Sequence, residues 1–350
     1  MNAPDTDRRL LIRAPNWLGD VVLALPAMAA IRRRAPSVHI TIAAPAGIAA
    51  LFREIGTDVA PDSVLDLPAS SRQAVQALRA GGFRSAIVMP NSFRSVWQLY
   101  RAGIADRAGF ATSGRGFLLT RKSARPKDSE IAHHSDYYRA LVRGLGIPCE
   151  SGELPRVAAT GAGIGRANDL LAQYKHPQDA RLVVLMPGAA NSQAKQWLPD
   201  RMADLAARLV QSRGVVCVLA GAAHDQPAAR AIESWLRARA PAAASRVLNL
   251  VGQTSLGTLA GVLSRTAVCV SNDAGGMHLA SALGRPVVAI FGPTDERSTR
   301  PAGDHDLIVE PVFCRPCMLR DCPIDHRCMK RITVDRVFDA VAERLSRGVR

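Results

Sequence analysis

The 350-residue sequence contains few aromatic residues, fewer acidic than basic side chains and no long apolar run. Aromatic side chains make up 5% of the chain, which is few for the stacking platforms that bind single-stranded nucleic acid. The longest apolar run, 21–31, is shorter than the roughly 18 residues of a transmembrane helix and leads into three arginines. Residues 1–10 lack the apolar core of a secretory signal. The sequence therefore predicts a cytoplasmic protein without a transmembrane segment.

The composition is that of a globular protein, with 48% hydrophobic and 21% charged residues. The length is enough for two domains, each with its own core. The formal net charge is +15, and the excess is spread over both halves of the chain. This charge favours a partner rich in phosphate or carboxylate groups, such as a nucleotide, nucleic acid or anionic membrane surface. Arginine far outnumbers lysine, which weakens inferences from charge alone.

Short apolar runs alternate with helical patterns in both halves of the chain, which predicts an α/β protein with parallel sheets. The predicted strands are 10–13, 39–43, 86–89, 182–186, 215–219, 267–270 and 287–291. We predict two Rossmann-like, doubly wound domains at 1–160 and 181–333, with a linker region at 161–180. A closing amphipathic helix occupies 334–350, with its pattern clearest from Val334 to Arg347. Ligands of such sheets bind beyond the carboxyl ends of the strands.

A glycine-rich turn lies between two predicted strands at 267–294. Asp273, Ala274, Gly275 and Gly276 follow the first strand, and a short helix over 277–283 comes next. Glycines let the backbone approach a ligand closely, and the free N–H groups of a helix start suit a phosphate. Alternatively, Asp273 is only a helix cap and the glycines only shape the turn.

Three other polar residues follow predicted strands. Asp20 is either a general base or a helix cap, because a carboxylate can serve both roles. Lys195, after the loop 187–191, either stabilises a diphosphate leaving group or is an ordinary surface lysine. Asp225 either contacts ribose hydroxyls or caps a helix.

Four cysteines, Cys314, Cys317, Cys322 and Cys328, have the spacing C-x2-C-x4-C-x5-C. In a cytoplasmic chain the cluster is a structural metal site, a redox-sensitive pair or a set of reduced thiols. Cys149, Cys217 and Cys269 are expected to be buried.

The segment 101–127 contains seven basic residues and one acidic residue, Asp106. With its glycines, it is predicted to be a mobile basic loop that meets phosphates or anionic lipid.

Four stretches of the chain, 13–27, 186–197, 271–294 and 314–328, resemble the lipopolysaccharide heptosyltransferases of glycosyltransferase family 9, which have the GT-B fold. These stretches occur in the same order as in the family and together span nearly the whole chain. The Pro-Asn-Trp-Leu-Gly-Asp sequence at 15–20 and the cysteine segment are most similar to heptosyltransferase II. The resemblance implies two Rossmann-like domains that face a central cleft.

The resemblance also implies an inverting transfer from ADP-L-glycero-β-D-manno-heptose to the first heptose of heptosyl-Kdo2-lipid A. The donor is bound by the second domain, and the acceptor by the first domain at the cytoplasmic face of the inner membrane. Asp20 is implied as the general base, and Lys195 as the group that stabilises the departing ADP. The family needs no catalytic metal or other cofactor, and no nucleic-acid partner is expected.

The implied binding residues fall into two sets. Those for the donor are Gly188, Ala190, Asn191, Asp225, Asp273, Ala274, Gly275, Gly276 and His278. Those for the acceptor are Asn16, Trp17, Gly19, Arg115, Arg121 and Lys122. Ala274 departs from the common family form, in which Ser or Thr follows the aspartate, so a side-chain hydroxyl contact is absent there.

Two alternatives stay open from the sequence. One is another family 9 transferase, of heptosyltransferase I or III type, with a different acceptor. The other is a basic nucleotide- or nucleic-acid-binding protein without catalysis, which would bind DNA in a strongly salt-dependent manner.

Overall fold

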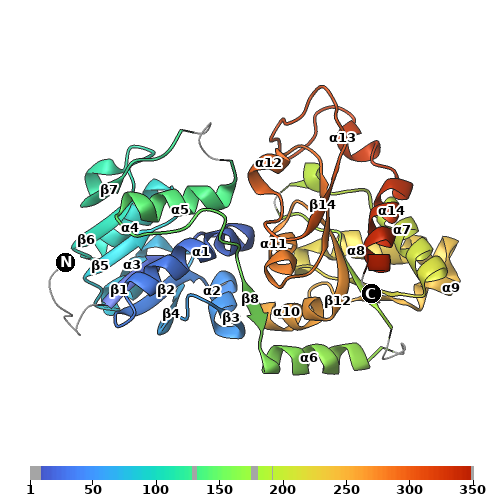
Figure 1. Ribbon diagram of the computed structural model, residues 1–350, viewed down its shortest axis with the longest axis horizontal. Helices are drawn as coiled ribbons and strands as arrows, with labels where there is room; N and C mark the ends of the chain where they lie inside the picture. The colour runs from blue at the N-terminus through green and yellow to red at the C-terminus, as the bar shows by residue number, and fades with distance from the viewer. Residues whose placement is uncertain (1–8, 128–131, 175–179, 191, 348–350) are drawn as a thin grey trace. The chain divides into compact units, whose positions relative to one another are not determined.

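The computed structural model describes residues 9–127, 132–174, 180–190 and 192–347 (Figure 1). The chain divides into two compact units, Met1–Ala158 and Ala159–Arg350. Each unit is built around its own six-stranded sheet.

The sheet of the first unit has the strand order β4-β2-β1-β5-β6-β7, and all of its neighbouring strands are parallel. The strands are β1 (Arg9–Arg13), β2 (His39–Pro45), β4 (Ser63–Leu67), β5 (Ser85–Val88), β6 (Asp106–Phe110) and β7 (Arg121–Ser123). The helices are α1 (Leu18–Arg34), α2 (Ala46–Glu54), α3 (Ser71–Ala80), α4 (Phe93–Arg101), η1 (Gly116–Leu118) and α5 (His134–Gly144). A separate two-stranded sheet pairs β3 (Ile55–Thr57) with β8 (Val157–Ala159).

Helices cover both faces of this sheet. On one face, Leu11 and Val88 form a core with Leu78 of α3 and Leu99 of α4. Since side chains alternate along a strand, the buried Ile12 and its neighbours point to the opposite face. The helices α1 and α5, which pack on each other, lie on the near side of the sheet in Figure 1.

The sheet of the second unit has the order β11-β10-β9-β12-β13-β14 and is also parallel throughout. The strands are β9 (Leu182–Met186), β10 (Val216–Leu219), β11 (Val247–Asn249), β12 (Thr266–Asn272), β13 (Val287–Phe291) and β14 (His305–Val309). The helices are α6 (Gly161–Ala172), η3 (Gln193–Lys195), α7 (Pro199–Arg213), η4 (Ala223–Asp225), α8 (Gln226–Arg239), α9 (Pro241–Ala244), α10 (Leu256–Ser264), α11 (Gly275–Ala282), α12 (Glu296–Thr299), α13 (Arg327–Lys330) and α14 (Val334–Arg347). Its main core packs side chains of α7, α8 and α14 against one face of the sheet.

The predicted linker region, 161–180, contains the helix α6 at 161–172. This helix packs on α10 at glycines: a Cβ added to Gly261 would lie 2.4 Å from the carbonyl oxygen of Gly163. Arg166 Nε also donates to Thr258 Oγ1 at 3.2 Å. The close approach of the two backbones therefore attaches α6 to the second unit. The predicted helix at Val334–Arg347 is confirmed as α14.

Both sheets have the same order when their strands are counted along the chain, 3-2-1-4-5-6, which is the Rossmann order. The strand order reverses between β1 and β5 in the first unit and between β9 and β12 in the second. Ligands of such sheets bind at this switch point, outside the carboxyl ends of the strands. The predicted fold class is confirmed, and the loops after β1, β5, β9 and β12 are the places to look for a site.

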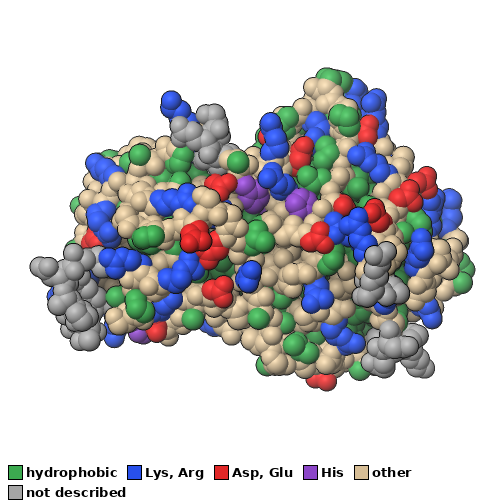
Figure 2. Space-filling view, in the orientation of Figure 1, with side chains coloured by type: hydrophobic (Ala, Val, Ile, Leu, Met, Phe, Trp, Pro, Cys, Tyr) green, Lys and Arg blue, Asp and Glu red, His purple; other side chains and the backbone are tan. Residues whose placement is uncertain are grey.

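The sequence predicted a single mobile loop at 101–127, and this prediction is wrong. The segment contains the end of α4, the strand β6, the turn η1 and the strand β7. The basic side chains of the chain are distributed over the visible surface of both units rather than gathered in one place (Figure 2). Within the described residues, no helix combines the length and the apolar character needed to cross a membrane.

Candidate active site

An ion pair between Lys195 and Asp273 lies at the switch point of the second unit. Asp273 follows β12 directly, and Lys195 ends η3 in the loop after β9. Lys195 Nζ lies 2.8 Å from Asp273 Oδ2, and Asp273 is buried. The same carboxylate accepts hydrogen bonds from Thr294 at 2.8 Å and Thr299 at 3.3 Å. Ala274 occupies the N-cap position of α11, so Asp273 is not the cap of that helix.

Asn272, the last residue of β12, anchors the loop that carries Lys195. Its amide nitrogen donates to the carbonyl oxygens of Pro187 at 2.9 Å and Gly188 at 3.3 Å, and its side-chain oxygen accepts from the backbone N–H of Trp197 at 3.0 Å. Trp197 is buried. Sequence reasoning missed Asn272, although its place between a strand end and Asp273 was a usable signal.

Asp225 fills the space beside Gly188. A Cβ added to Gly188 would lie 2.0 Å from Asp225 Cγ, so any other residue there would require the Asp225 side chain to shift. Asp225 is buried, and its Oδ2 accepts from the backbone N–H of Ala222 at 3.0 Å. Burial raises the pKa of Asp225, while His224 and the Ala222 N–H act in the opposite direction. The loops after β9 and β10 therefore meet at a buried carboxylate.

The remaining predicted donor residues lie around the same strand ends. Gly275 and Gly276 begin α11, and a Cβ on Gly276 would lie 2.3 Å from Met186 Sδ, so this glycine also serves packing. His278 is buried within α11, and Ala190 is exposed. Asn191 lies outside the described residues.

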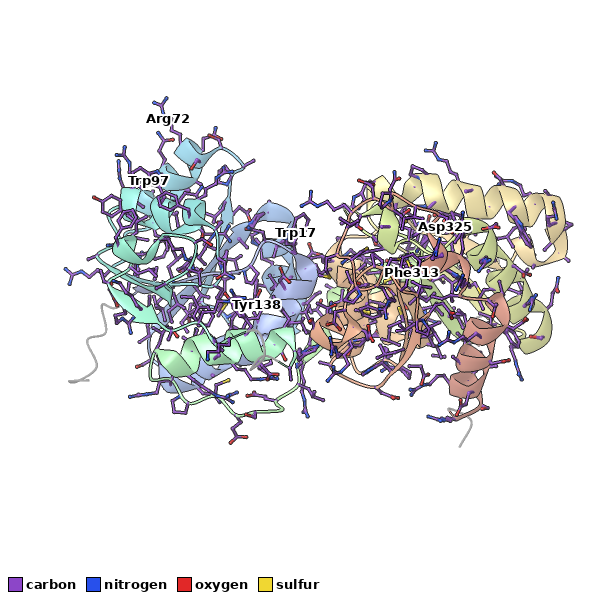
Figure 3. The ribbon with its side chains drawn as sticks, turned by 90° about the horizontal axis from the view of Figure 1, so that it is seen from above. Trp17, Arg72, Trp97, Tyr138, Phe313 and Asp325 are labelled. Carbon is purple, nitrogen blue, oxygen red and sulfur yellow. The ribbon has the colours of Figure 1, made fainter. Side chains whose placement is uncertain are left out.

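In the first unit, Asp20 lies in the first turn of α1, after the N-cap residue Trp17. Asp20 is therefore not the cap, and its charge is favourably placed near the positive end of the helix dipole. Its Oδ1 lies 3.7 Å from Nε2 of His134, the first residue of α5. Trp17 and Tyr138 are labelled in Figure 3, where both belong to this unit.

Tyr138 lies beside His134, with the two rings edge to face at 5.2 Å between centroids. Burial, and then the charge of Asp20, raise the pKa of Tyr138 well above its usual value. Both effects favour the neutral phenol over the phenolate. Sequence reasoning missed His134 and Tyr138, which are four residues apart on α5 and thus share a helix face.

Arg13, at the end of β1, supports the loop that leads to Asp20. Its guanidinium is buried and donates to Asn16 Oδ1 at 2.5 Å and to the carbonyl oxygen of Ala14. Burial, with a smaller contribution from Arg94, lowers the pKa of Arg13 to about 10. Asn16 is exposed and Gly19 half-buried in the same loop.

The predicted acceptor residues Arg115 and Arg121 are not brought to Asp20. Arg115 is fully buried, and its guanidinium donates to the carbonyl oxygens of Phe110, Pro90 and Ser92. This arginine supports the loop after β5 instead of presenting its charge to a ligand. Lys122 is exposed on β7.

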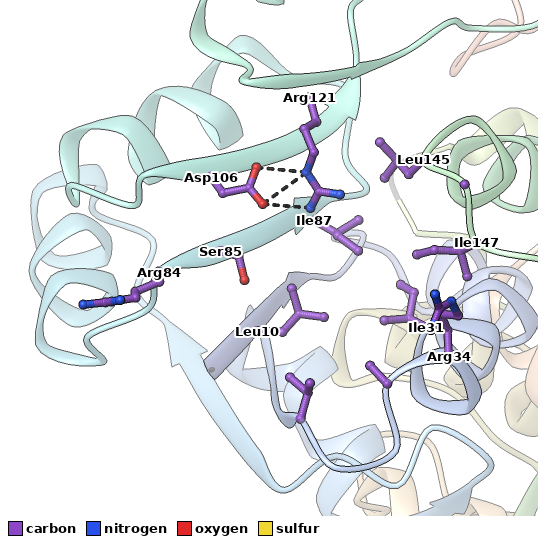
Figure 4. A pocket seen from close by; sticks show the side chains of 13 residues that line it. Leu10, Ile31, Arg34, Arg84, Ser85, Ile87, Asp106, Arg121, Leu145 and Ile147 are labelled. Atoms are coloured by element: carbon purple, nitrogen blue, oxygen red, sulfur yellow. Dashed lines mark hydrogen bonds and ion pairs between the residues drawn. The ribbon is translucent and has the colours of Figure 1, made fainter. Parts of the chain in front are cut away.

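Arg121 pairs with Asp106 at 2.8 Å, at the amino end of β6 (Figure 4). Both residues line a cavity of about 540 Å³, together with Leu10 and Ser85 from the starts of β1 and β5. Asp20 follows the carboxyl end of β1, so Arg121 belongs to the opposite edge of the sheet.

The four clustered cysteines lie in the segment after β14. Cys322 is exposed and Cys328 buried, and burial followed by the charges of the other three raises the pKa of Cys328. His326 Nε2 lies 2.7 Å from the carbonyl oxygen of Ala194, in the turn that carries Lys195. Among the described residues, no three His, Cys, Asp or Glu side chains are arranged to hold a metal ion. Cys217 and Cys269 are buried, and burial raises the pKa of each to about 12.

The two Rossmann-type units have the GT-B fold of a solved heptosyltransferase, and the family comparison makes the chain a glycosyltransferase. The chain belongs to glycosyltransferase family 9, the heptosyltransferase family, whose model matches residues 71–327.

Curated relatives and a solved structure point to one branch of the family. Lipopolysaccharide heptosyltransferase 2 of Escherichia coli is 28% identical over 84% of this chain and 85% of its own length. Lipooligosaccharide heptosyltransferase 2 of Haemophilus ducreyi is 26% identical over 97% of this chain and 99% of its own length. The structure of E. coli ADP-heptose LPS heptosyltransferase II matches with a TM-score of 0.81 and 25% identity, over 98% of this chain and 100% of that one. The predicted resemblance to heptosyltransferase II is thereby confirmed.

Proposed function

We propose that this glycosyltransferase moves L-glycero-D-manno-heptose from ADP-heptose to the first heptose of heptosyl-Kdo2-lipid A, with inversion at the anomeric carbon. The observation that carries the proposal is the Lys195–Asp273 pair at the switch point of the second unit. It provides one positive and one negative group at the place where a sheet of this order binds a nucleotide ligand. The name of the matched solved structure, an ADP-heptose LPS heptosyltransferase, supplies the donor class.

The two charges of this pair suit different parts of the donor. The Lys195 ammonium attracts the diphosphate and stabilises the negative charge that develops as ADP leaves. Asp273 would repel a phosphate, so we assign it to hydroxyl groups of the donor sugar. Backbone N–H groups of Ala274, Gly275 and Gly276 at the start of α11 add a site for the phosphates. Gly188, Ala190, Asn191, Asp225 and His278 complete the proposed donor site.

Asp20 is the proposed general base in the first unit. In the transfer, its carboxylate takes the proton of the acceptor hydroxyl while that oxygen bonds to the anomeric carbon. The bond from the anomeric carbon to the phosphate oxygen breaks, and its electron pair leaves with ADP. Asn16, Trp17 and Gly19 would contact the acceptor, and His134 would orient the Asp20 carboxylate. The proposed reaction needs no metal or cofactor.

Release of ADP in a donor and acceptor panel tests the proposal. The full-length protein is incubated with ADP-heptose and heptosyl-Kdo2-lipid A, and product is identified by mass. We expect release of ADP that depends on the acceptor and a product heavier by one heptose. A preference for UDP- or GDP-sugars, or no transfer from ADP-heptose, would refute the proposed donor.

The acceptor arm distinguishes the members of the family. Two further acceptors, Kdo2-lipid A without heptose and an acceptor that already carries two heptoses, test the alternative of another family 9 transferase with a different acceptor. We expect turnover with the singly heptosylated acceptor. Turnover with only one of the other two acceptors would support heptosyl transfer but refute the proposed acceptor.

A further inference from the structure

A cluster of exposed aromatic side chains covers α4 and the adjacent turn η1. Phe93, Trp97 and Tyr100 are all exposed on α4, and Phe117 of η1 is 74% exposed. Phe93 contacts Trp97 and Phe117, each with 6.2 Å between ring centroids, and Trp97 lies 5.7 Å from Tyr100. These four residues, here called the aromatic patch, are notable in a chain with 5% aromatic residues. Figure 3 shows Trp97 at the outer side of its unit.

The aromatic patch is not part of the core of its unit. Val96 and Leu99 of α4 pack in the core beneath the helix, together with Leu78 of α3. Phe93, Trp97 and Tyr100 have the spacing i, i+4, i+7 and so form a second apolar stripe on the opposite, solvent-facing side. Contiguous exposed apolar patches of this kind commonly mark interaction sites.

The surroundings of the aromatic patch are basic. The packed helices α3 and α4 carry Arg72, Arg79, Arg94 and Arg101, all exposed, and contain no acidic residue. Arg101 lies over the Trp97 ring at 5.7 Å, and Arg107 over the Tyr100 ring at 5.4 Å. Tryptophan and tyrosine rings flanked by arginines are typical of surfaces that lie at the headgroup level of a bilayer.

We propose that the aromatic patch and the arginines of α3 and α4 dock this enzyme on the surface of an anionic lipid bilayer. An anionic surface complements the four arginines, and the rings enter the boundary between headgroups and acyl chains. A second copy of the chain is a poorer partner, because a symmetric interface would place the arginines of one copy against those of the other.

The position of the patch fits a lipid-anchored acceptor, and this choice of partner rests on the proposed function. Phe93 follows the loop after β5, and Phe117 follows the loop after β6. Parallel strands end at one edge, so both residues lie at the edge of the sheet where Asp20 follows β1. Docking through the patch would hold this edge near the membrane in which the acceptor is anchored.

Flotation with vesicles tests the docking surface without any turnover. The full-length protein is mixed with vesicles of phosphatidylcholine, alone or with an equal part of phosphatidylglycerol. We expect flotation only with phosphatidylglycerol, and weaker flotation at high salt. Replacing Phe93, Trp97 and Phe117 together by serine should weaken binding roughly tenfold or more, and Arg101→Gln alone about fivefold. Phe313→Ser, which removes an exposed ring from the second unit, is the matched control and should bind as the wild type does.

A thermal melt and a soluble acceptor separate docking from folding and catalysis. The triple variant should melt near the wild type, because it loses only exposed rings, and should use a deacylated, soluble acceptor as fast as the wild type. With acceptor embedded in vesicles, it should be at least several-fold slower. Wild type that does not float, or a triple variant that floats equally well, would overturn the docking surface. A wild-type dimer that the triple variant converts to a monomer would assign the patch to a second copy instead. Flotation that depends on the patch in a protein inactive on every heptose acceptor would retain the docking surface and refute the proposed function.

Discussion

The ammonium of Lys195 lies 2.8 Å from the carboxylate of Asp273. The aspartate side chain is nearly inaccessible to solvent, whereas the lysine side chain is 28% exposed. Two threonine hydroxyls also donate to Asp273, so part of its hydrogen-bonding capacity is satisfied without the lysine. The lysine head therefore has one buried partner and one open side. This asymmetry is what a group that contacts an incoming phosphate needs.

Lys195→Met should lower kcat by about 10²–10³, because it removes charge stabilisation of the leaving group. The thermal stability should fall by only about 1 kcal/mol, since the pair is partly exposed and the threonines remain. Steady-state kinetics and a thermal melt measure the two effects.

A matched control for Lys195→Met is Arg344→Met. Arg344 forms an ion pair with Asp306 at 2.6 Å at the amino end of β14, opposite the proposed site. The control should lose stability and keep kcat. Equal losses of kcat in both variants would assign the effect of Lys195→Met to general destabilisation.

Asp20→Asn should keep the fold and lower kcat by about 10²–10⁴, because asparagine retains the shape of the side chain but cannot accept the proton. His134→Gln, which removes the ring 3.7 Å from Asp20, should have a smaller effect and alter the pH profile of kcat. Rates over a range of pH with both variants provide the measurement. Near-wild-type turnover by Asp20→Asn would exclude Asp20 as the base.

Asp225→Asn should stabilise the protein at neutral pH and weaken donor binding. Burial raises the folded-state pKa of Asp225 above 3.8, so the folded state holds this proton more tightly than the unfolded state does. The contribution of Asp225 to stability is therefore complete below pH 3.8 and is lost as the pH rises through the folded pKa. Asparagine does not titrate, and it can still accept from the Ala222 N–H.

Thermal melts between acidic and neutral pH check this sign. The free energy of unfolding of Asp225→Asn relative to wild type, obtained from the melts, should increase with pH by an amount on the order of 1 kcal/mol. The KM for the donor should rise if Asp225 contacts it. If the stability of the wild type increased relative to the variant as the pH rises, the Asp225 carboxylate would be stabilised in its charged form.

Much of the fold was predictable because buried parallel strands are short apolar runs with clear ends. The prediction for β9, 182–186, matches the structure at both ends, and the turn after β12 was identified from its glycines. Residues after such strands are placed by topology alone, which is why Asp20, Lys195 and Asp273 could be selected from the sequence.

Contacts between distant loops were not predictable in this way. The link from Asn272 to the loop at Pro187, and the contact between Asp20 and His134, join segments that no local pattern connects. Arg115 was predicted to contact the acceptor because its basic neighbours suggested a surface loop. In the structure its guanidinium is buried and donates to three backbone carbonyl oxygens.

Gly188→Ala should destabilise the protein by about 1–3 kcal/mol, because the added methyl group overlaps the buried Asp225 carboxylate. The same change in an Asp225→Ala background should cost less, by roughly 1 kcal/mol or more, since the clashing atoms are gone. Denaturant unfolding of the four proteins of this cycle gives the coupling. Gly165→Ala is the matched control: its added Cβ meets nothing within 4 Å and it lies inside α6, so alanine should be neutral or stabilising there. Additive effects of Gly188→Ala and Asp225→Ala would mean that the loops after β9 and β10 do not share this space, and that the donor site is less closely packed than the contact between Gly188 and Asp225 implies.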